Sequence, residues 1–222
     1  MGRSIQVFPR FSHLGDCALL MEAPPPLDIA WQRRIWALAP AVKEWAGVSE
    51  VMPGMNNMMV RFDPLVVPAD ALRADILALW PHCSWVGDKG KTLEVEVTYG
   101  GENGMDLGHV AAHAGLSVAE VVRLHAQACY TVYFLGAYPG FGYLGGLPAQ
   151  LFTPRRAVPR VQVPPNSVAI GGSQAGVIPS PAPSGWHVIG QAREVFFDLA
   201  RTPPALLAPG DEVRFRVAGI EP

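Results

Sequence analysis

Arginine is the only charged residue type in a long central stretch of this chain. Residues 121–193 number 73 and contain no aspartate or glutamate. A guanidinium group donates paired hydrogen bonds to carboxylates and phosphates, and an acid-free neighbourhood offers it few internal partners. The stretch is therefore predicted to hold a small anion, and it is poorly suited to chemistry that needs paired carboxylates. Its formal charges come from Arg123, Arg155, Arg156, Arg160 and Arg193.

Three of these arginines lie close together in the segment TPRRAVPR, residues 153–160. Arg155, Arg156 and Arg160 either bind an anion or a partner protein, or they belong to a solvated loop. The lack of acids nearby in the sequence removes salt-bridge partners, which keeps the anion-binding interpretation open for at least one of them.

A glycine-rich segment at residues 140–145 matches the dinucleotide fingerprint G-x-G-x-x-G. The fingerprint needs a following helix and an acid about 20 residues on. Residues 146–148 (GLP) stop any helix, and the next acid is Glu194. These glycines are expected to form a tight loop, with Tyr138, Phe141 and Tyr143 as packing or pocket-wall aromatics.

A second glycine-rich segment, residues 171–176, lacks the Lys-Ser/Thr ending of a P-loop. Its backbone amides and the Gln174 side chain either hold a carboxylate or carbonyl group, or form a plain glycine hairpin.

Three histidines have spacings that chemistry could use. His125 falls near the end of a predicted helix and before a predicted strand, where it is either a general acid/base or a structural residue. His109 and His113 lie four apart on a predicted helix, but no third ligand is evident. A surface pair is the simpler interpretation, and no metal site is predicted.

The composition excludes several functional classes. The formal net charge of -2 and the isoelectric point near 6.3 argue against a nucleic-acid binder. No apolar run approaches the roughly 20 residues that span a bilayer, and the first residues lack the pattern of a signal peptide. The three cysteines are widely spaced and are expected to be reduced thiols. We expect a cytoplasmic protein that does not bind membranes.

The first half of the chain is predicted to alternate strands and helices. The order β-α-β-β-α, either alone or closed by a fourth strand, is that of a split βαβ, ferredoxin-like sandwich. The alternating residues 93–97 either close this sheet or start a second domain, and the charged, glycine-containing residues 87–91 favour a boundary near residue 90. The segments are a strand at 17–22, a helix at 27–41, strands at 48–52 and 57–62, and a helix at 68–80.

The second half begins with helices and continues with short strands. A helix is expected at 106–114, and a capping box, Ser117-x-x-Glu120, begins the next. Short strands between Gly/Pro turns then indicate a sandwich or barrel. The expected domains are 1–90, α+β, and 91–222, a β-barrel with a helical insert near 106–128. The strand segments are 131–135, 158–163, 167–170, 187–189, 195–199 and 212–217.

Several motifs resemble one known family. The segments YTVYFLG at 130–136 and PGFGYLGG at 139–146 are similar to a signature of the family of 5-oxoprolinase B-type subunits. That family has also been called allophanate hydrolase subunit 1, and it includes the Bacillus sporulation-kinase inhibitor KipI. The resemblance covers almost the whole chain, through further motifs at 15–20, 51–54, 62–64, 99–102, 153–160, 184–186, 189–190 and 206–211.

The resemblance implies a fold, partners and an activity. It implies an N-terminal α+β domain followed by a C-terminal cyclophilin-like β-barrel. It implies two partners: a C-type homologue (PxpC-like) with a similar barrel, and an A-type partner (PxpA-like) of the LamB/YcsF family. Together the three would open 5-oxoproline to L-glutamate using ATP, which is shared with the partner subunits. This chain would then be a non-autonomous subunit of an amide hydrolase.

On this resemblance, an anion-holding surface is expected at the junction with the C-type partner. An arginine fork would hold the 5-oxoproline carboxylate or a phosphorylated intermediate, and an amide would orient the ring carbonyl. His125 is expected nearby as the candidate catalytic residue. The substrate-binding residues are expected to be Phe141, Arg155, Arg160, Gln174 and Trp186.

The sequence leaves two other functions open. One is half of a biotin-dependent carboxyltransferase acting on urea or a related amide, with the biotin carrier elsewhere. The other is a KipI-like regulator that binds a histidine kinase, because one fold supports different roles. A homo-oligomer that covers the partner surface when the chain is alone is also an open alternative.

Overall fold

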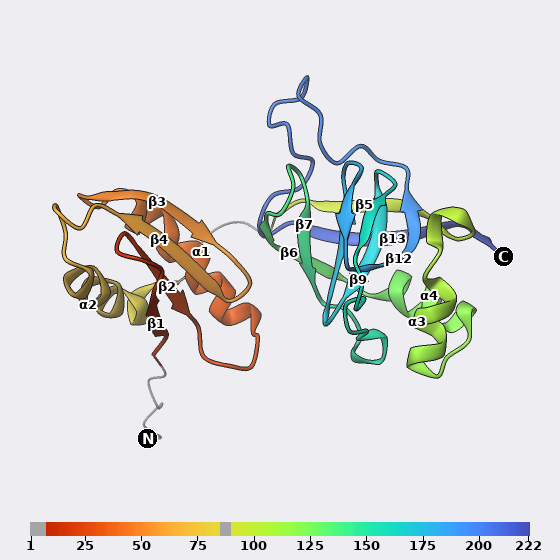
Figure 1. Ribbon diagram of the computed structural model, residues 1–222, viewed down its shortest axis with the longest axis horizontal. Coiled ribbons are helices and arrows are strands. Elements are labelled where there is room, and N and C mark those ends of the chain that lie inside the picture. Colours follow the sequence, from red (N-terminus) through yellow and green to blue (C-terminus); the bar gives the residue numbers. More distant parts are fainter. Residues whose placement is uncertain (1–7, 85–89) are drawn as a thin grey trace. The chain divides into compact units, whose positions relative to one another are not determined.

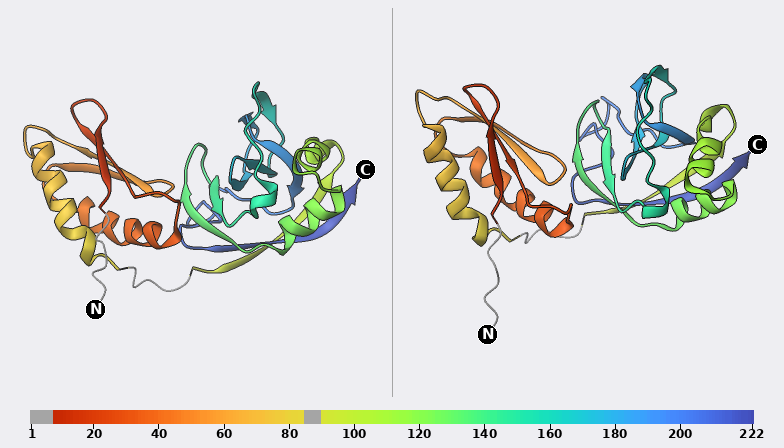
Figure 2. Two further views of the ribbon diagram at one scale, coloured as in Figure 1. Left: turned by 90° about the horizontal axis from the view of Figure 1, so that it is seen from below. Right: turned by 60° about the horizontal axis from the view of Figure 1, so that its bottom comes forward.

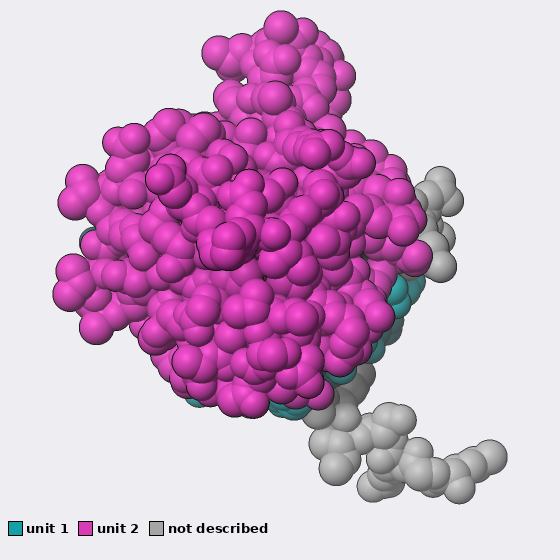
Figure 3. All heavy atoms as spheres, turned by 90° about the vertical axis from the view of Figure 1, so that its right-hand side faces the viewer, with its two compact units in different colours: residues 1–88 teal, residues 89–222 magenta. Residues whose placement is uncertain are grey.

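The computed structural model describes residues 8–84 and 90–222. The chain divides into two compact units, Met1–Asp88 and Lys89–Pro222, which Figure 3 shows in different colours. Figure 1 gives the order of the elements in each unit. Together they make a mixed α+β protein, and each unit is described by itself.

The first unit is an antiparallel four-stranded sheet with two helices on one face (Figure 2). Both helices bury apolar side chains against the sheet, among them Ile35 and Leu38 from α1 and Leu72 and Ile76 from α2. The sheet order is β1-β2-β4-β3. The elements are β1 Arg10–His13, β2 Ala18–Glu22, α1 Ile29–Lys43, β3 Val48–Pro53, β4 Asn57–Phe62, α2 Ala69–Leu79 and the 3₁₀ turn η1 Trp80–His82.

The fourth strand of this sheet differs from the predicted one. The predicted β-α-β-β-α order is present as β2-α1-β3-β4-α2, but the edge strand is β1, which precedes β2 in the chain. β1 is short and mostly exposed, with only Phe11 partly buried. Its sequence therefore lacks the alternation by which a strand is recognised. The segment at 93–97 belongs to β5 of the second unit.

The second unit contains a closed seven-stranded barrel, in the order β10-β7-β6-β13-β5-β12-β9. β5 and β13 pair in parallel, and the other neighbouring pairs are antiparallel. β5 shows why the barrel closes on an apolar core: Val95 and Val97 are buried while Glu94 and Glu96 are not. The barrel strands are β5 Thr92–Gly100, β6 Tyr130–Leu135, β7 Gly142–Gly145, β9 Ser167–Gly171, β10 Gln174–Ile178, β12 His187–Ala192 and β13 Glu212–Glu221.

Smaller elements surround the barrel. α3 and α4 pack beside each other, α3 against β12 and α4 against β13, and the predicted capping box of Ser117 and Glu120 begins α4. A separate two-stranded sheet joins β8 to β11. No helix in the described residues is long and apolar enough to cross a membrane. These elements are η2 Glu102–Gly104, α3 Leu107–Ala114, α4 Val118–Gln127, η3 Ala149–Leu151, β8 Arg160–Val163 and β11 Ala182–Ser184.

Three segments of the second half differ from expectation. β7 is a strand where a tight loop was expected, and β11 was not predicted as a strand. The hairpin considered for residues 171–176 is present as part of β9 and β10, and a Cβ at Gly176 would come within 2.9 Å of the Phe141 ring. Conversely, residues 195–199 are not a strand. They lie in an arm that projects from the barrel and has one isolated bridge, Phe197 to Ala205 (Figure 1).

Two glycines on the same side of the barrel give a test of the backbone argument. Gly100 has a φ of +79°, and a Cβ there would lie 2.2 Å from the Glu221 carbonyl oxygen. Gly100→Ala is expected to lower the free energy of unfolding by about 1–3 kcal/mol. Gly108, in α3, has open space around a Cβ. Gly108→Ala is expected to raise the free energy of unfolding by about 0.5–1 kcal/mol.

Urea denaturation of both variants measures the difference. Equal or inverted effects would contradict the close approach of β5 and β13 at this end.

Candidate functional site

A small cavity of about 170 Å³ lies on the outer surface of the barrel. Aromatic side chains form its walls and a single arginine stands at its rim. Its lining residues are Ala137, Tyr138, Phe141, Tyr143, Arg155, Ile178, Pro183, Ser184, Gly185 and Trp186. Three of the five predicted substrate-binding residues, Phe141, Arg155 and Trp186, therefore come together here.

Glycines in two barrel strands make room for these walls. A Cβ at Gly171 of β9 would lie 2.5 Å from the indole of Trp186. A Cβ at Gly176 of β10 would lie 2.9 Å from the ring of Phe141. Neither position tolerates a larger residue without displacing backbone or ring. The two aromatic side chains thus rest on the sheet itself, which holds them in place.

The aromatic rings contact each other edge to face. Phe141 and Trp186 have ring centroids 5.5 Å apart at an interplanar angle of 78°. Tyr143 lies 4.7 Å from Phe141 at 87° and 5.8 Å from Trp186 at 78°. Aromatic rings favour this arrangement. The Tyr138 hydroxyl donates to the Pro183 carbonyl at 2.8 Å, which fixes the remaining wall.

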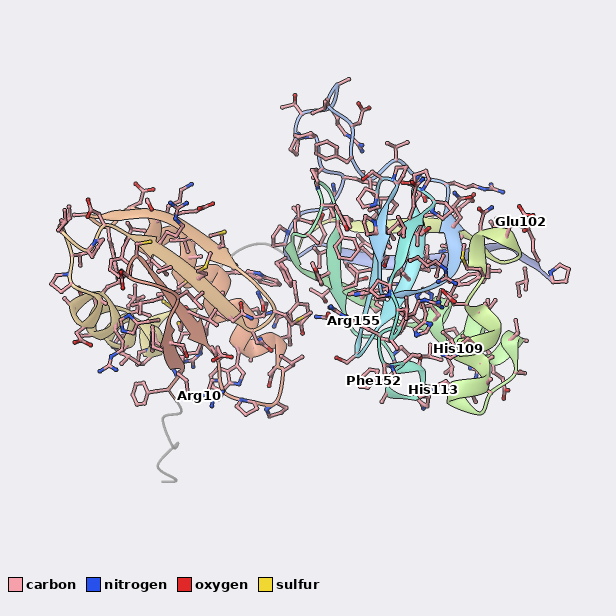
Figure 4. The ribbon with its side chains drawn as sticks, in the orientation of Figure 1. Arg10, Glu102, His109, His113, Phe152 and Arg155 are labelled. Carbon is pink, nitrogen blue, oxygen red and sulfur yellow. The ribbon has the colours of Figure 1, made fainter. Side chains whose placement is uncertain are left out.

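Arg155 supplies the positive charge of the cavity. Its guanidinium carbon lies 5.6 Å from the centroid of the Trp186 ring, in a cation–π contact. The side chain is exposed, and it forms no ion pair with any described residue (Figure 4). Burial raises the pKa of Tyr143 above its ordinary value, although the Arg155 charge acts in the opposite direction. Tyr143 therefore stays protonated and can donate a hydrogen bond.

The other predicted anion-binding arginine, Arg160, is already occupied by an internal carboxylate. Its guanidinium donates to both carboxylate oxygens of Asp106, at 2.5 and 2.8 Å, and Arg156 donates to the same carboxylate at 3.1 Å. The expectation of an arginine fork holding the substrate is thus corrected for Arg160. Asp106 lies outside the acid-free stretch, at the predicted start of a helix. Acidic residues are common at that position, so the sequence does not mark Asp106 as an arginine partner.

The charge of Asp106 is stabilised by these contacts. Burial raises its pKa, but the hydrogen bonds from Arg160 and the Val188 backbone, together with the charges of Arg160 and Arg156, bring the pKa below its ordinary value. Its side chain is only 4% exposed. A buried carboxylate with four donors is a fixed internal partner, which an incoming anion does not readily displace.

His125 does not lie at the cavity. It is fully buried in the barrel core, with its Nδ1 2.8 Å from the Tyr99 hydroxyl and its ring stacked on Phe215 at 4.6 Å. Burial lowers its pKa to about 3, so the imidazole is neutral at physiological pH. The general acid/base role considered for His125 does not fit this position, because the ring is enclosed in the barrel core.

Gln174 lies beside the cavity but does not line it. It begins β10 directly after the turn at Gly172, which has a φ of +65°. It shares a face of β10 with Ile178, a cavity residue. Its pairing partner is Gly171, the residue beneath Trp186. The backbone of residues 171–176 thus forms the hairpin that was considered. The Gln174 side chain lies at the edge of the cavity.

The histidine pair on α3 is exposed, as the surface-pair interpretation expects, and one member also makes a ring contact. His109 stacks on His187 of β12, with ring centroids 4.6 Å apart, and Figure 4 labels His109 and His113 on α3. The His187 Nε2 lies 2.9 Å from the Pro154 carbonyl oxygen. Among the described residues, no group of three or more His, Cys, Asp or Glu is arranged to hold a metal ion.

Two larger hollows of the second unit are chemically less suited to an anion. One, of about 540 Å³, contains Arg214 and Arg216. Both are already paired, with Glu212 at 2.7 Å and with Glu94 respectively. The other, of about 590 Å³, is lined mainly by glycines and apolar side chains near Gly100. The cavity at Arg155 is thus the one of these three with an arginine that lacks a carboxylate partner among the described residues.

Comparison with known proteins gives one consistent family. The family model described as "Carboxyltransferase domain, subdomain C and D" matches residues 9–207. The B-type subunit of 5-oxoprolinase from Escherichia coli O157:H7 is 46% identical over 91% of this chain and 93% of its own length. The protein of the same name from Haemophilus influenzae is 40% identical over 94% of this chain and 97% of its own length.

Solved structures extend the comparison to longer chains. The crystal structure of TTHA0988 superposes with a TM-score of 0.75 at 33% identity, over 91% of this chain and 40% of that chain. This chain thus spans less than half of that protein. The Kluyveromyces lactis urea carboxylase superposes with a TM-score of 0.82 at 18% identity, over 98% of this chain and 22% of that enzyme. The latter likeness concerns the fold alone.

The buried imidazole gives a pH prediction. Because the folded pKa of His125 is lowered to about 3 and an unfolded histidine titrates near 6.5, the unfolded chain binds more protons between these values. The free energy of unfolding should therefore fall below pH 6.5, by up to about 1.4 kcal/mol per pH unit from this residue. Above pH 6.5 this contribution is constant.

Urea denaturation at pH 7 and pH 5 measures the effect. The double variant Tyr99→Phe/His125→Leu removes both partners of the buried hydrogen bond and should lose less stability on acidification than the natural chain. Asp106 and His187 titrate in both proteins and cancel in the comparison. The same loss in both proteins would contradict the buried, neutral state of His125.

Proposed function

This chain belongs to the family of 5-oxoprolinase B-type subunits, and we propose that it is a non-autonomous subunit of an ATP-dependent 5-oxoprolinase. The reaction opens the lactam C–N bond of 5-oxoproline with water and gives L-glutamate. The observation that carries the proposal is the Arg155 guanidinium, which has no carboxylate partner among the described residues and stands at an aromatic cavity.

The size and chemistry of the cavity support a substrate of this kind. 5-Oxoproline is a small, flat ring with one carboxylate. Arg155 would bind the carboxylate, since a charged hydrogen bond is stronger than a neutral one. The faces of Trp186 and Phe141 would hold the ring. The Tyr143 hydroxyl would donate to the ring carbonyl, and Gln174 at the edge of the site would assist it.

The cavity provides binding groups but no proton-transfer group near neutral pH. Its lining has no Asp, Glu or His, and the pKa of Tyr143 is raised. General acid–base catalysis works best with a group whose pKa lies near the working pH. We therefore propose that a C-type homologue covers this surface and completes the site, and that an A-type partner takes part as well.

ATP is proposed to bind mainly on the partner subunits. The cavity of about 170 Å³ is smaller than the roughly 300–1,000 Å³ of sites for drug-sized ligands. The glycine-rich segment at residues 171–176 also lacks the Lys-Ser/Thr ending of a P-loop. Its residues at the cavity do not fit a triphosphate, and no step of the reaction is assigned to the nucleotide.

The proposal extends to the fold types of the two units and to the location of the protein. We regard the first unit as a variant of the ferredoxin-like sandwich and the barrel as cyclophilin-like. A cytoplasmic location fits reduced cysteines, and all three, Cys17, Cys83 and Cys129, are free.

A carboxyltransferase role is the second candidate. It is favoured by the family model for a carboxyltransferase domain and by the shared fold with urea carboxylase. An arginine at an aromatic cavity would also hold a carboxylated intermediate. Carboxyl transfer that depends on a biotinylated carrier and a C-type partner would support this function. Turnover of 5-oxoproline without any such carrier would count against it.

The Arg155 site predicts a specific kinetic defect. In a mixture of this chain with its A-type and C-type partners, Arg155→Ala should raise the KM for 5-oxoproline roughly 10- to 150-fold, the equivalent of about 1.5–3 kcal/mol for a lost charged hydrogen bond. Arg155→Lys should have a smaller effect, because it keeps the charge and loses the fork. Arg123→Ala is the matched control, since Arg123 is exposed on α4 and contacts Gln127.

Steady-state assays of glutamate and ADP formation give the answer. No turnover above background in the natural mixture would refute the assignment to 5-oxoprolinase. Turnover with an unchanged KM in Arg155→Ala would be consistent with a 5-oxoprolinase but would show that Arg155 does not bind the substrate.

A further inference from the structure

The carboxylate of Asp106 connects three separate parts of the barrel unit. Asp106 precedes α3, and its side chain accepts the backbone N–H of Val188 in β12 at 2.8 Å. The same carboxylate accepts two hydrogen bonds from Arg160 of β8 and one from Arg156. Its own N–H donates to the Val188 carbonyl at 2.8 Å. α3, β12 and the arginine segment 153–160 are thus joined at one buried group.

Further hydrogen bonds hold the backbone on both sides of Arg155. On one side, the Pro154 carbonyl oxygen lies 2.9 Å from the His187 Nε2. On the other, the Arg156 N–H donates to the Gly185 carbonyl at 2.8 Å, while the Arg156 guanidinium donates to Asp106 at 3.1 Å. Arg155 is therefore presented from a short segment whose neighbours are fixed, and Gly185 itself lines the cavity.

The carboxylate also determines which cation is left for a ligand. The segment carries three arginines, and Asp106 binds two of them, Arg156 and Arg160. Arg155 is the third, and it has no carboxylate partner among the described residues. A buried charge pair that loses one member leaves the other uncompensated. Without the Asp106 charge, two further guanidinium groups would need an anion and would compete for the substrate carboxylate.

We propose that Asp106 is a positioning residue for substrate binding, acting through Arg156 and Arg160 to hold Arg155 over Trp186 as the cation that receives the carboxylate. The identity of that ligand as 5-oxoproline rests on the proposed function above. The placement of Arg155 by Asp106 is a property of this chain alone.

The kinetic test compares Asp106→Asn, Arg155→Ala and the double variant in the mixture with the A-type and C-type partners. Asp106→Asn should raise the KM for 5-oxoproline by roughly 5- to 50-fold with a smaller change in kcat. In the Arg155→Ala background it should have almost no further effect on KM, since both changes remove the same interaction. Effects on KM that multiply would overturn the proposal.

Asp211→Asn is the matched control. Asp211 is also buried and also accepts backbone N–H groups, from Lys91 at 3.1 Å and from Ala208 at 2.8 Å, but it does not contact the arginine segment. It should lower the melting temperature to a similar extent without changing the KM. Equal changes in KM for the two variants would mean that Asp106 acts only through general stability.

A second readout does not depend on turnover. The chain is labelled with 5-fluorotryptophan, and the ¹⁹F resonance of Trp186 is assigned with Trp186→Phe. Asp106→Asn and Arg155→Ala should shift this resonance in the same direction, because both remove the guanidinium from the indole, and Asp211→Asn should leave it in place. An unmoved resonance in Asp106→Asn would refute the positioning role, even in a chain that has no 5-oxoprolinase activity.

Arg156→Gln covers the case in which Asp106→Asn does not fold. It removes one link between Asp106 and the segment and leaves the paired contact of Arg160 intact. It should shift the Trp186 resonance in the same direction as Arg155→Ala, by a smaller amount. No shift in this variant would also count against the proposal.

Discussion

A buried carboxylate stays charged only where several donors replace the water it has lost. Asp106, at the start of α3, meets this requirement with donors from β12 and the segment 153–160. The Val188 N–H, Arg156 and Arg160 supply four hydrogen bonds to it. The start of α3, strand β12 and the segment 153–160 must therefore keep their relative positions. The cavity at Arg155 depends on this constraint, because one of its walls and its only arginine come from residues next to those donors.

The second constraint is the close approach of aromatic rings to barrel strands. Trp186 lies on Gly171 and Phe141 lies on Gly176, at distances that exclude a side chain at either glycine. Phe141 and Trp186 come from the residues just before β7 and β12, and their rings rest on the sheet itself. A rigid apolar wall beside one cation suits a small, flat anion, whose ring and carboxylate need different surroundings.

Much of the architecture could be predicted from the sequence, because local patterns determine it. The alternation in β5 and the capping box of Ser117 and Glu120 are such local signals, and both are present in the structure. β1 is too short and too exposed to give a pattern. β7 contains two glycines and β10 contains one, and glycine normally marks turns; at Gly176 the missing side chain makes room for the Phe141 ring.

The site was predictable in part, for a related reason. The aromatic residues and Arg155 lie within conspicuous motifs of the acid-free stretch. Asp106 lies outside it, and the pairing with Arg160 is a contact across 54 residues that no local pattern encodes. His125 was misjudged because its position near the end of a helix indicates neither the barrel core nor its neutral state. Long-range packing decides both cases.

The central claim is that Arg155 alone, among the three arginines of its segment, receives the substrate anion. A crystal structure of this chain with its partner subunits and bound 5-oxoproline tests it most directly. The account predicts the ligand carboxylate within about 3 Å of the Arg155 guanidinium, with the ring against Trp186 and the Asp106 contacts unchanged. A carboxylate bound instead to Arg156 or Arg160, or a ligand remote from this cavity, would contradict it.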